Sequence, residues 1–378
     1  MPAGAAPPPE PTARLRRWPR RPRPLTLILL VTNVLALAAV AAVLVYWDLY
    51  LLSPASDPFT RGPFLIRLST DAATLAWMLP GNGPVQLEAV SPAGRTVRAR
   101  GGRFSDLSPG TRYLWTASVN GDARASGSFA TAPLTLDRPI EFAVIGDYGS
   151  GSEHEWEVGR TLAAEHPDFV LTAGDNSYLV ALPVNLDRNI FQPLHAVMSE
   201  APLWATEGEH DLFFDGGGFV TNALHLPGTA GRWVIDYGPI QIDALGLQAD
   251  AGSVATLNRL AATTHPALRF VLVHRPIGPQ DPIATVLRRD RVTAVFCGHL
   301  HRYERRVIGG VREFTVGVSG EGPGASQFTR PSPDAIVSML NYGSLRVEIA
   351  GGLIRYAFID ELGRVLDRTT QPISPPAQ

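Results

Sequence analysis

Five short apolar runs beyond residue 140 each end at a segment that carries acidic or histidine side chains. The runs and the segments that follow them are EFAVI-GDYG, DFVLTA-GDNSY, PLWAT-EGEHD, RFVLV-H and VTAVF-CGHLH. In open α/β sheets, ligand sites lie beyond the carboxyl ends of the strands. The five runs therefore predict an α/β fold in which polar side chains from five strands converge on one site.

The segment from residue 138 to residue 370 alternates strand-like runs with helical stretches. The helical stretches are HEWEVGRTLAAE at 154–165 and VATLNRLAAT at 254–263, and the strand-like runs LRVEIA and LIRYAFID close the segment. This alternation is typical of layered α/β domains, in which helices flank β-sheets. We therefore predict one α/β layered domain over 138–370, followed by a proline-rich tail at 371–378.

Short alternating or β-branched runs, separated by glycine and proline clusters, fill residues 60–133. Such spacing predicts a small all-β sandwich. The stretch LSPGTRY resembles the part of fibronectin type III domains where a tyrosine, here Tyr113, closes a corner between the sheets. No residue of this segment suggests chemistry, so we expect it to act as a spacer or packing domain.

The amino-terminal part holds one long uncharged apolar run, at residues 25–46. It has 22 residues, and a membrane span needs roughly 20. Six arginines precede it within residues 1–24, and aromatic residues begin the linker 47–59. Because basic residues stay cytoplasmic and aromatic residues gather at the interface, we predict a single-pass membrane anchor with residues 1–24 in the cytoplasm and the domain at 138–370 outside it. A cleaved signal peptide is the alternative, and Arg16 and Arg17 suit a twin-arginine signal.

Composition narrows the class of partner. A formal net charge of -2 over 378 residues gives no electrostatic basis for binding nucleic acid. The chain has one cysteine, Cys297, and therefore no intramolecular disulfide. Because Cys297 stands at the end of an apolar run, we expect a small core residue rather than a nucleophile.

The residues at the strand ends are of the types that hold metal ions. Any one of these motifs alone is more often structural than a ligand, so the prediction rests on the ordered set. Oxygen and imidazole donors without thiolate suit iron, zinc or manganese, and a carboxylate can bridge two ions about 3.5–4 Å apart. His299 and His301 stand one residue apart on an extended stretch, so both side chains point to the same side and could each serve one ion.

The ordered set resembles the signature of the metallophosphoesterases, in the form found in purple acid phosphatases. The family pattern reads GDxG, GDxxY, GN-H-D/E, VxxH and GHxH, and the chain reads GDYG, GDNSY, GEHD, VLVH and GHLH. The flanking stretches WVIDYGPIQIDAL and GHLHRYER are also similar to the family. The resemblance covers roughly residues 60 to 370, and many members carry a fibronectin-like domain before the catalytic domain. It implies an α/β layered metallophosphoesterase domain.

Carried over position by position, the resemblance implies two metal sites. The first metal would be held by Asp147, Asp175, Tyr178 and His301, and the second by Asp175 as the bridge with Glu209, His274 and His299. Other metallophosphoesterases have a histidine where this chain has Gly149, so Tyr178 favours the purple branch, with Fe(III) at the first site and Fe(II), Zn or Mn at the second. His210 would donate a proton or stabilise charge on the phosphoryl oxygens.

Glu209 departs from the family pattern, which has asparagine at this position. Glutamate offers a charged carboxylate one methylene longer than the neutral amide. Glu209 could ligate the second metal, bind it more tightly and lower its Lewis acidity, as carboxylates are ordinary ligands for these ions. Alternatively, its reach displaces the ligand and leaves a weak second site.

The resemblance implies that the chain hydrolyses a small-molecule phosphate ester outside the cytoplasm, preferentially a monoester. The metals would clamp the phosphoryl group and lower the pKa of a bound water, so that hydroxide is available near neutral pH. Diesters and nucleotides are alternative substrates. A surface-binding protein with a degraded metal site is a further alternative, whereas seven ligands exceed what a structural zinc needs. The oligomeric state is not predicted.

Overall fold

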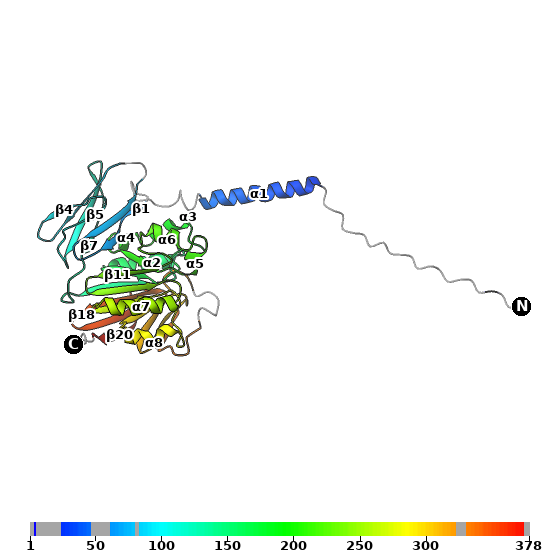
Figure 1. Cartoon of the computed structure of the whole chain (residues 1–378). Helices are drawn as coiled ribbons and strands as arrows, with labels where there is room; N and C mark the ends of the chain where they lie inside the picture. Colours follow the sequence, from blue (N-terminus) through cyan, green and yellow to red (C-terminus); the bar gives the residue numbers. More distant parts are fainter. Residues whose placement is uncertain (1–3, 5–23, 47–60, 80–82, 323–329, 374–378) are drawn as a thin grey trace. The chain divides into compact units, whose positions relative to one another are not determined.

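The computed structural model describes residue 4 and residues 24–46, 61–79, 83–322 and 330–373 (Figure 1). The predicted linker 47–59, nearly all of the basic segment 1–24 and most of the tail 371–378 lie outside these residues. Two compact units are present, residues 1–52 and residues 53–378, and each is described by itself.

The first unit contains helix α1 (Pro24–Tyr46), which coincides with the apolar run at 25–46. Among the helices whose residues are described, none has both the length and the apolar character needed to cross a membrane. The predicted membrane anchor is therefore not supported by the structure.

The second unit begins with seven strands in two antiparallel sheets, as the alternation at 60–133 predicts. One sheet has the order β1-β2-β5 and the other β4-β3-β6-β7. Their bounds are β1 (Arg61–Leu68), β2 (Ala73–Met78), β3 (Val85–Val90), β4 (Thr96–Arg98), β5 (Arg103–Phe104), β6 (Arg112–Val119) and β7 (Asp122–Ala130). The backbone N–H of Ser108 donates to the hydroxyl of Tyr113 at 2.9 Å, a corner contact of the kind expected from LSPGTRY. The relationship to fibronectin type III domains stays a prediction.

The α/β part contains two further sheets. The six-stranded sheet has the order β10-β9-β8-β18-β19-β20, with bounds β10 (Leu203–Ala205), β9 (Phe169–Thr172), β8 (Ile140–Ile145), β18 (Gly343–Ala350), β19 (Leu353–Asp360) and β20 (Val365–Pro372). The seven-stranded sheet has the order β11-β12-β13-β14-β16-β15-β17, with bounds β11 (Arg232–Tyr237), β12 (Ile240–Leu245), β13 (Leu268–Leu272), β14 (Ala294–Cys297), β16 (Val311–Val316), β15 (Tyr303–Ile308) and β17 (Val337–Met339). Strands β8, β9 and β10 run parallel, as do β12, β13, β14 and β16.

Aromatic side chains join the inner faces of these two sheets. Phe142 of β8 stacks on Phe169 of β9 with ring centroids 4.7 Å apart. The same ring meets Phe270 of β13 edge-on at 5.3 Å and Phe296 of β14 at 5.9 Å. Because these four rings are fully buried, they fix the two sheets face to face and bring the ends of their parallel strands together.

Helices cover the outer faces of the sheets (Figure 1). Helix α2 (Glu153–Glu165) packs Val158 and Leu162 into the cluster that contains β8 and β9. Helices α7 (Ala251–Thr263) and α8 (Pro282–Arg289) pack on β13 and β14. The remaining helical segments are α3 (Pro183–Leu186), the π-helix η2 (Asp187–Phe191), α4 (His195–Met198), α5 (Glu209–Leu212) and α6 (Gly218–Ala223). The predicted layered α/β arrangement is confirmed.

The β-sandwich is packed onto the α/β part rather than separated from it. The indole N–H of Trp115 on β6 donates to the carbonyl of Ser199 at 2.9 Å, and the hydroxyl of Tyr237 donates to the carbonyl of Ala130 at 3.1 Å. Buried residues of both parts belong to one continuous apolar cluster. This contact fits the predicted packing role of residues 60–133.

Candidate metal centre

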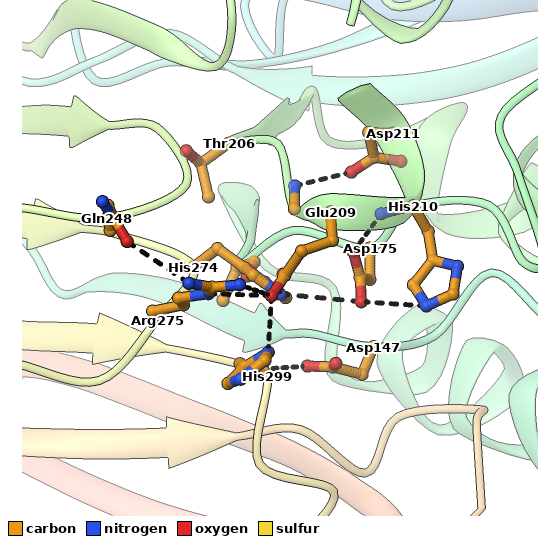
Figure 2. Close-up of polar contacts among 12 residues, drawn as sticks. Asp147, Asp175, Thr206, Glu209, His210, Asp211, Gln248, His274, Arg275 and His299 are labelled. Carbon is orange, nitrogen blue, oxygen red and sulfur yellow. Dashed lines mark hydrogen bonds and ion pairs between the residues drawn. The ribbon is translucent and has the colours of Figure 1, made fainter. Parts of the chain in front are cut away.

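The side chains predicted to form the site follow strands of both inner sheets and come together between them. Figure 2 shows Asp147, Asp175, Glu209, His210, His274 and His299. Asp147 follows β8, Asp175 and Tyr178 follow β9, and Glu209 and His210 begin α5 after β10. His274 follows β13 of the second sheet, and His299 and His301 follow β14. Two parallel strand sets, one in each sheet, therefore meet end to end at the site.

The first group of donors surrounds the hydroxyl of Tyr178. This hydroxyl lies 3.0 Å from Oδ1 of Asp147, 3.0 Å from Oδ2 of Asp175 and 3.3 Å from Nε2 of His301. Nδ1 of His301 lies 2.9 Å from the carbonyl oxygen of Gly322. Because that carbonyl can only accept, Nδ1 carries the proton and Nε2 faces the group as a lone-pair donor.

The second group of donors surrounds the carboxylate of Glu209. Oε2 of Glu209 lies 2.7 Å from Nε2 of His274, and Oε1 lies 3.2 Å from Nδ1 of His299. Nδ1 of His274 lies 2.7 Å from the carbonyl oxygen of Ala173, which again directs Nε2 toward the site. The longer side chain of Glu209 therefore does not carry its carboxylate away from the two histidines.

Asp175 stands between the two groups. Its Oδ2 accepts a hydrogen bond from the Tyr178 hydroxyl and lies 3.6 Å from Nε2 of His274. Its Oδ1 accepts from the backbone N–H of His210 at 3.0 Å, which holds the carboxylate in this orientation. A carboxylate shared in this way has the position required of a bridging ligand.

His210 lies at the open side of the site. Nδ1 of its ring lies 2.5 Å from the carbonyl oxygen of Leu179, so Nδ1 carries a proton. Its Nε2 lies 3.9 Å from Oδ2 of Asp175, and its ring packs against Tyr178 with centroids 4.4 Å apart. The side chain is 35% exposed, so Nε2 can reach a molecule bound over the two donor groups.

Three of the predicted ligands have left-handed backbone conformations. The φ angles are 50° at Asp147, 51° at Asp175 and 66° at His299. Non-glycine residues rarely adopt such angles, because the conformation costs about 1–3 kcal/mol per residue. Residues strained in this way concentrate at functional sites. The neighbouring glycines leave room for the turns, because a Cβ at Gly208 or Gly298 would collide with the carboxylates of Asp175 or Asp147 respectively.

Gly149 explains why the first group uses a tyrosine. A Cβ at this position would collide with the backbone of Asn176 and Ser177. No histidine side chain fits at residue 149 without moving that loop. The hydroxyl of Tyr178 contacts the two carboxylates from the other side of the loop.

The donors fit metal ions. Two clusters have ligand atoms within 4.8 Å of one another, Glu209 with His274 and His299, and Asp147 with Asp175 and His274. Among the described residues, Oε2 of Glu209 and Nε2 of His274 are buried and form no hydrogen bond of acceptable geometry, although they face each other. A buried anion and an imidazole lone pair aimed at the same point are satisfied by a shared cation.

Electrostatics also call for positive charge at this site. Burial raises the pKa of the Tyr178 hydroxyl well above its usual range, and the carboxylates of Asp147 and Asp175 raise it further. Burial by itself lowers the pKa of His274, but Asp175 and Glu209 outweigh it and raise that pKa to about 10. The carboxylates therefore favour positive charge at this site, which a metal ion bound to neutral His274 would supply, and a tyrosinate at Tyr178 would require such a cation.

Two residues of the motifs have roles that the sequence does not assign. The buried carboxylate of Asp211 accepts from the backbone N–H of Gly208 at 2.9 Å and of Asn176 at 2.9 Å. It also accepts from the side-chain amide of Asn176 at 2.8 Å, and that amide donates to the carbonyl of Thr206. This network ties the loop after β9 to the loop after β10, so it sets the distance between Asp175 and Glu209.

Two histidines and the cysteine have contacts other than those of the site. His154 pairs with Glu361 at 2.6 Å and His166 with Glu200 at 2.6 Å, both away from the metal donors. Cys297 is fully buried in the apolar cluster of β13, β14 and α8, as expected for a core residue. Arg275 was not predicted, although its position beside His274 and the extra negative charge of Glu209 are both visible in the sequence.

The segment that holds all eight predicted site residues matches a known family. Residues 140–303 match the model of the calcineurin-like phosphoesterases. The chain therefore contains a calcineurin-like phosphoesterase domain and is similar to purple acid phosphatases. It is 25% identical over 300 residues to purple acid phosphatase 22 of Arabidopsis thaliana, an alignment that covers 66% of this chain and 65% of that protein. With purple acid phosphatase 21 of the same plant, the identity is 26% over 240 residues, which cover 54% and 52% respectively. The chain spans about half to two thirds of the length of these curated relatives.

Solved structures share the fold. A purple acid phosphatase from yellow lupin (Lupinus luteus) seeds superposes with a TM-score of 0.68 at 15% identity, covering 82% of this chain and 73% of the other. The structure of PhoD gives a TM-score of 0.62 at 12% identity, covering 84% and 91%. At such identities the likeness establishes only the fold of the chain.

Proposed function

We propose that the chain is a binuclear metal-dependent phosphatase that hydrolyses phosphate monoesters. The observation that carries the proposal is the position of Asp175, whose Oδ2 contacts the Tyr178 hydroxyl at 3.0 Å and approaches Nε2 of His274 to 3.6 Å. One carboxylate shared by two donor groups is the arrangement that a two-metal hydrolase needs. The similarity to purple acid phosphatases supports the same reaction class.

The proposed ligand sets divide at Asp175. Asp147, Tyr178 and His301 would hold the first metal, proposed as Fe(III), and Glu209, His274 and His299 would hold the second, proposed as Fe(II), Zn or Mn. Bound metals supply Lewis acidity toward the phosphoryl oxygens and lower the pKa of water. The strained backbone at Asp147, Asp175 and His299 supports this assignment, because it orients these side chains before any metal binds.

The role proposed for His210 is proton donation to the leaving oxygen. The proton on Nδ1 is engaged by the carbonyl of Leu179, which leaves Nε2 as the atom that exchanges a proton with bound substrate. Its partial exposure suits a group that must contact a leaving group at the mouth of the site. Oδ2 of Asp175 lies 3.9 Å from this Nε2 atom.

The proposal is tested with the purified full chain and a generic aryl phosphate, after loading with Fe, Zn or Mn and metal analysis. We expect turnover with two metals per chain. Absence of turnover with every metal, in a protein that binds two metals, would favour a surface-binding role instead. A higher kcat/KM for an aryl phosphodiester or a nucleotide than for the monoester would replace the monoester assignment.

The location of the enzyme outside the cytoplasm is also a proposal. Its support is the sequence order of six arginines followed by the apolar run 25–46, which suits an anchor or a cleaved signal peptide. Protease treatment of intact cells, followed by detection of the 138–370 domain, tests it. The proposal would be contradicted if the protease left that domain intact in whole cells and digested it only after the cells were lysed.

A further inference from the structure

Arg275 contacts the one ligand that departs from the family pattern (Figure 2). It follows His274 directly, and its Nε donates to Oε1 of Glu209 at 2.8 Å. Its Nη2 donates to the same oxygen, and its Nη1 reaches Oε1 of Gln248 at 3.3 Å. The guanidinium is therefore bonded to Glu209 through Nε and Nη2 and to Gln248 through Nη1.

These contacts divide the two oxygens of Glu209 between different partners. Oε1 accepts from Arg275 and lies 3.2 Å from His299, whereas Oε2 faces Nε2 of His274 at 2.7 Å and has no contact with the guanidinium in the described part of the chain. Arg275 thus holds the Glu209 carboxylate through Oε1. Oε2 is available to a ligand shared with Nε2 of His274.

The pair also balances charge. The carboxylate of Glu209 accepts two hydrogen bonds from the guanidinium through Oε1, the geometry of an ion pair in which the glutamate is an anion. The guanidinium of Arg275 is always a cation. Together the two side chains contribute a net charge of zero beside the second metal position. A neutral amide ligand would contribute the same net charge.

We propose that Arg275 is a positioning residue that acts through Glu209, so that the Glu209–Arg275 ion pair serves as one charge-neutral ligand unit for the second metal. This inference rests on the proposed function for the identity of the site. It predicts that the two residues are interdependent: a neutral ligand at 209 is compatible with the site only when the cation at 275 is removed as well.

A direct contact of Arg275 with the phosphoryl group is the competing role. The structure favours positioning, because Nε and Nη2 are already bonded to Glu209 and Nη1 to Gln248. The guanidinium would have to leave these partners in order to bind substrate. The two roles make opposite predictions for metal binding. If Arg275 binds phosphate, the effect of Glu209 on metal affinity does not depend on Arg275. If Arg275 positions Glu209, it does.

The test uses four variants of the full chain: Glu209→Asn, Arg275→Met, their combination, and Arg275→Lys. Zinc affinity at the second site is measured by calorimetry, and Co(II) at that site by its visible spectrum, so neither readout requires turnover. Glu209→Asn alone leaves the guanidinium unpaired beside the metal position. We therefore expect the second-site Zn affinity to fall by about 10–100-fold in this variant.

In the double variant we expect the affinity to recover by about tenfold over Glu209→Asn, because the repelling cation is gone. Arg275→Met alone should change the Co(II) spectrum, because Glu209 is no longer held by Oε1, and Arg275→Lys should partly restore it. Arg289→Met, which removes an exposed arginine paired with Asp290, is the matched control and should change neither.

Equal or weaker Zn binding in the double variant than in Glu209→Asn would overturn the inference. A Co(II) spectrum of Arg275→Met identical to that of the unsubstituted chain would also overturn it. This measurement tests the inference even if Glu209→Asn does not fold. Weaker binding of inorganic phosphate in the double variant than in Glu209→Asn would assign Arg275 to the substrate instead. Failure of the proposed function shows separately, as metal binding without turnover.

Discussion

The hydroxyl of Tyr178 donates to Oδ2 of Asp175 at 3.0 Å. The two residues are three positions apart on the loop after β9, and Asp147 and His301 complete the group around the hydroxyl. Asp147 follows β8 and His301 follows β14, whereas the tyrosine and the aspartate share one loop. The chemistry of the first metal position therefore depends on the conformation of residues 175–178.

Replacing Tyr178 by phenylalanine tests the ferric assignment. If Tyr178 binds Fe(III) as tyrosinate, the iron-loaded chain should absorb visible light, and Tyr178→Phe should lose this band. Visible spectroscopy with iron analysis measures both. Tyr113→Phe, in the β-sandwich, is the control and should keep the band. A colourless, active, iron-free enzyme would exclude Fe(III) at this position.

Replacing Asp175 by asparagine should abolish most activity. Loss of groups that merely orient a ligand lowers metal affinity or activity 10–100-fold, so a shared carboxylate should cost about 100-fold or more in kcat/KM. The measurement is steady-state turnover of an aryl phosphate together with metal content. Asp215→Asn, at an exposed position, is the matched control. Retention of two metals and full turnover by Asp175→Asn would refute the bridging role.

Replacing Asp211 by asparagine should destabilise the fold. The carboxylate accepts N–H groups from Gly208 and Asn176 inside the protein, and an amide would present a donor to them. We expect a loss of about 1–3 kcal/mol in the free energy of unfolding, measured with denaturant. Asp122→Asn removes an exposed pair with Arg124 and should cost at most about 0.5 kcal/mol. Equal effects of the two substitutions would argue against the network.

Removing metal with a chelator should lower the melting temperature. The site brings Asp147, Asp175 and Glu209 together, and a cation that binds only the folded chain stabilises it by about 2.7 kcal/mol at 100 times its Kd. We expect the melting temperature to fall by about 5 °C and to return when metal is added back. An unchanged melting temperature would show that these donors hold no metal in the purified chain.

Glu165 should make stability depend on pH. Burial raises the pKa of this carboxyl to about 7, although Arg346 lowers it and Glu141 raises it further. Because the folded pKa lies above the unfolded value, ionisation destabilises the folded chain progressively from about pH 4.5 to pH 7 and fully above pH 7. As the pH rises through this window, the free energy of unfolding of Glu165→Gln should therefore increase by about 1–3 kcal/mol relative to that of the unsubstituted chain.

Unfolding by urea at several pH values measures that difference. Glu157→Gln, on the same helix, is the control because a hydrogen bond from Arg160 lowers the pKa of Glu157. Because the folded pKa of Glu157 lies below the unfolded value, its contribution changes only below about pH 4.5, and the Glu157→Gln difference should stay constant between pH 4.5 and pH 7. A Glu165→Gln difference that does not change between pH 4.5 and pH 7 would contradict the buried-carboxyl interpretation.

The sequence by itself determined which side chains stand at the strand ends, because a strand that ends in Gly-Asp or Gly-His is a local pattern. It also determined the alternation of strands and helices after residue 138 and the short antiparallel strands before it. The apolar run at 25–46 predicts a membrane span as well, and the structure does not support it. Hydropathy records only composition and length, which several kinds of apolar segment share.

Only the tertiary structure decided that the donors come from two sheets rather than one. The five strands look alike in sequence, and the packing of Phe142 and Phe169 on Phe270 and Phe296 is what divides them into facing sheets. The same holds for Glu209. Its carboxylate lies between His274 and Arg275, 66 positions away from the arginine, because hydrogen-bond partners are selected by distance after folding and not by order along the chain.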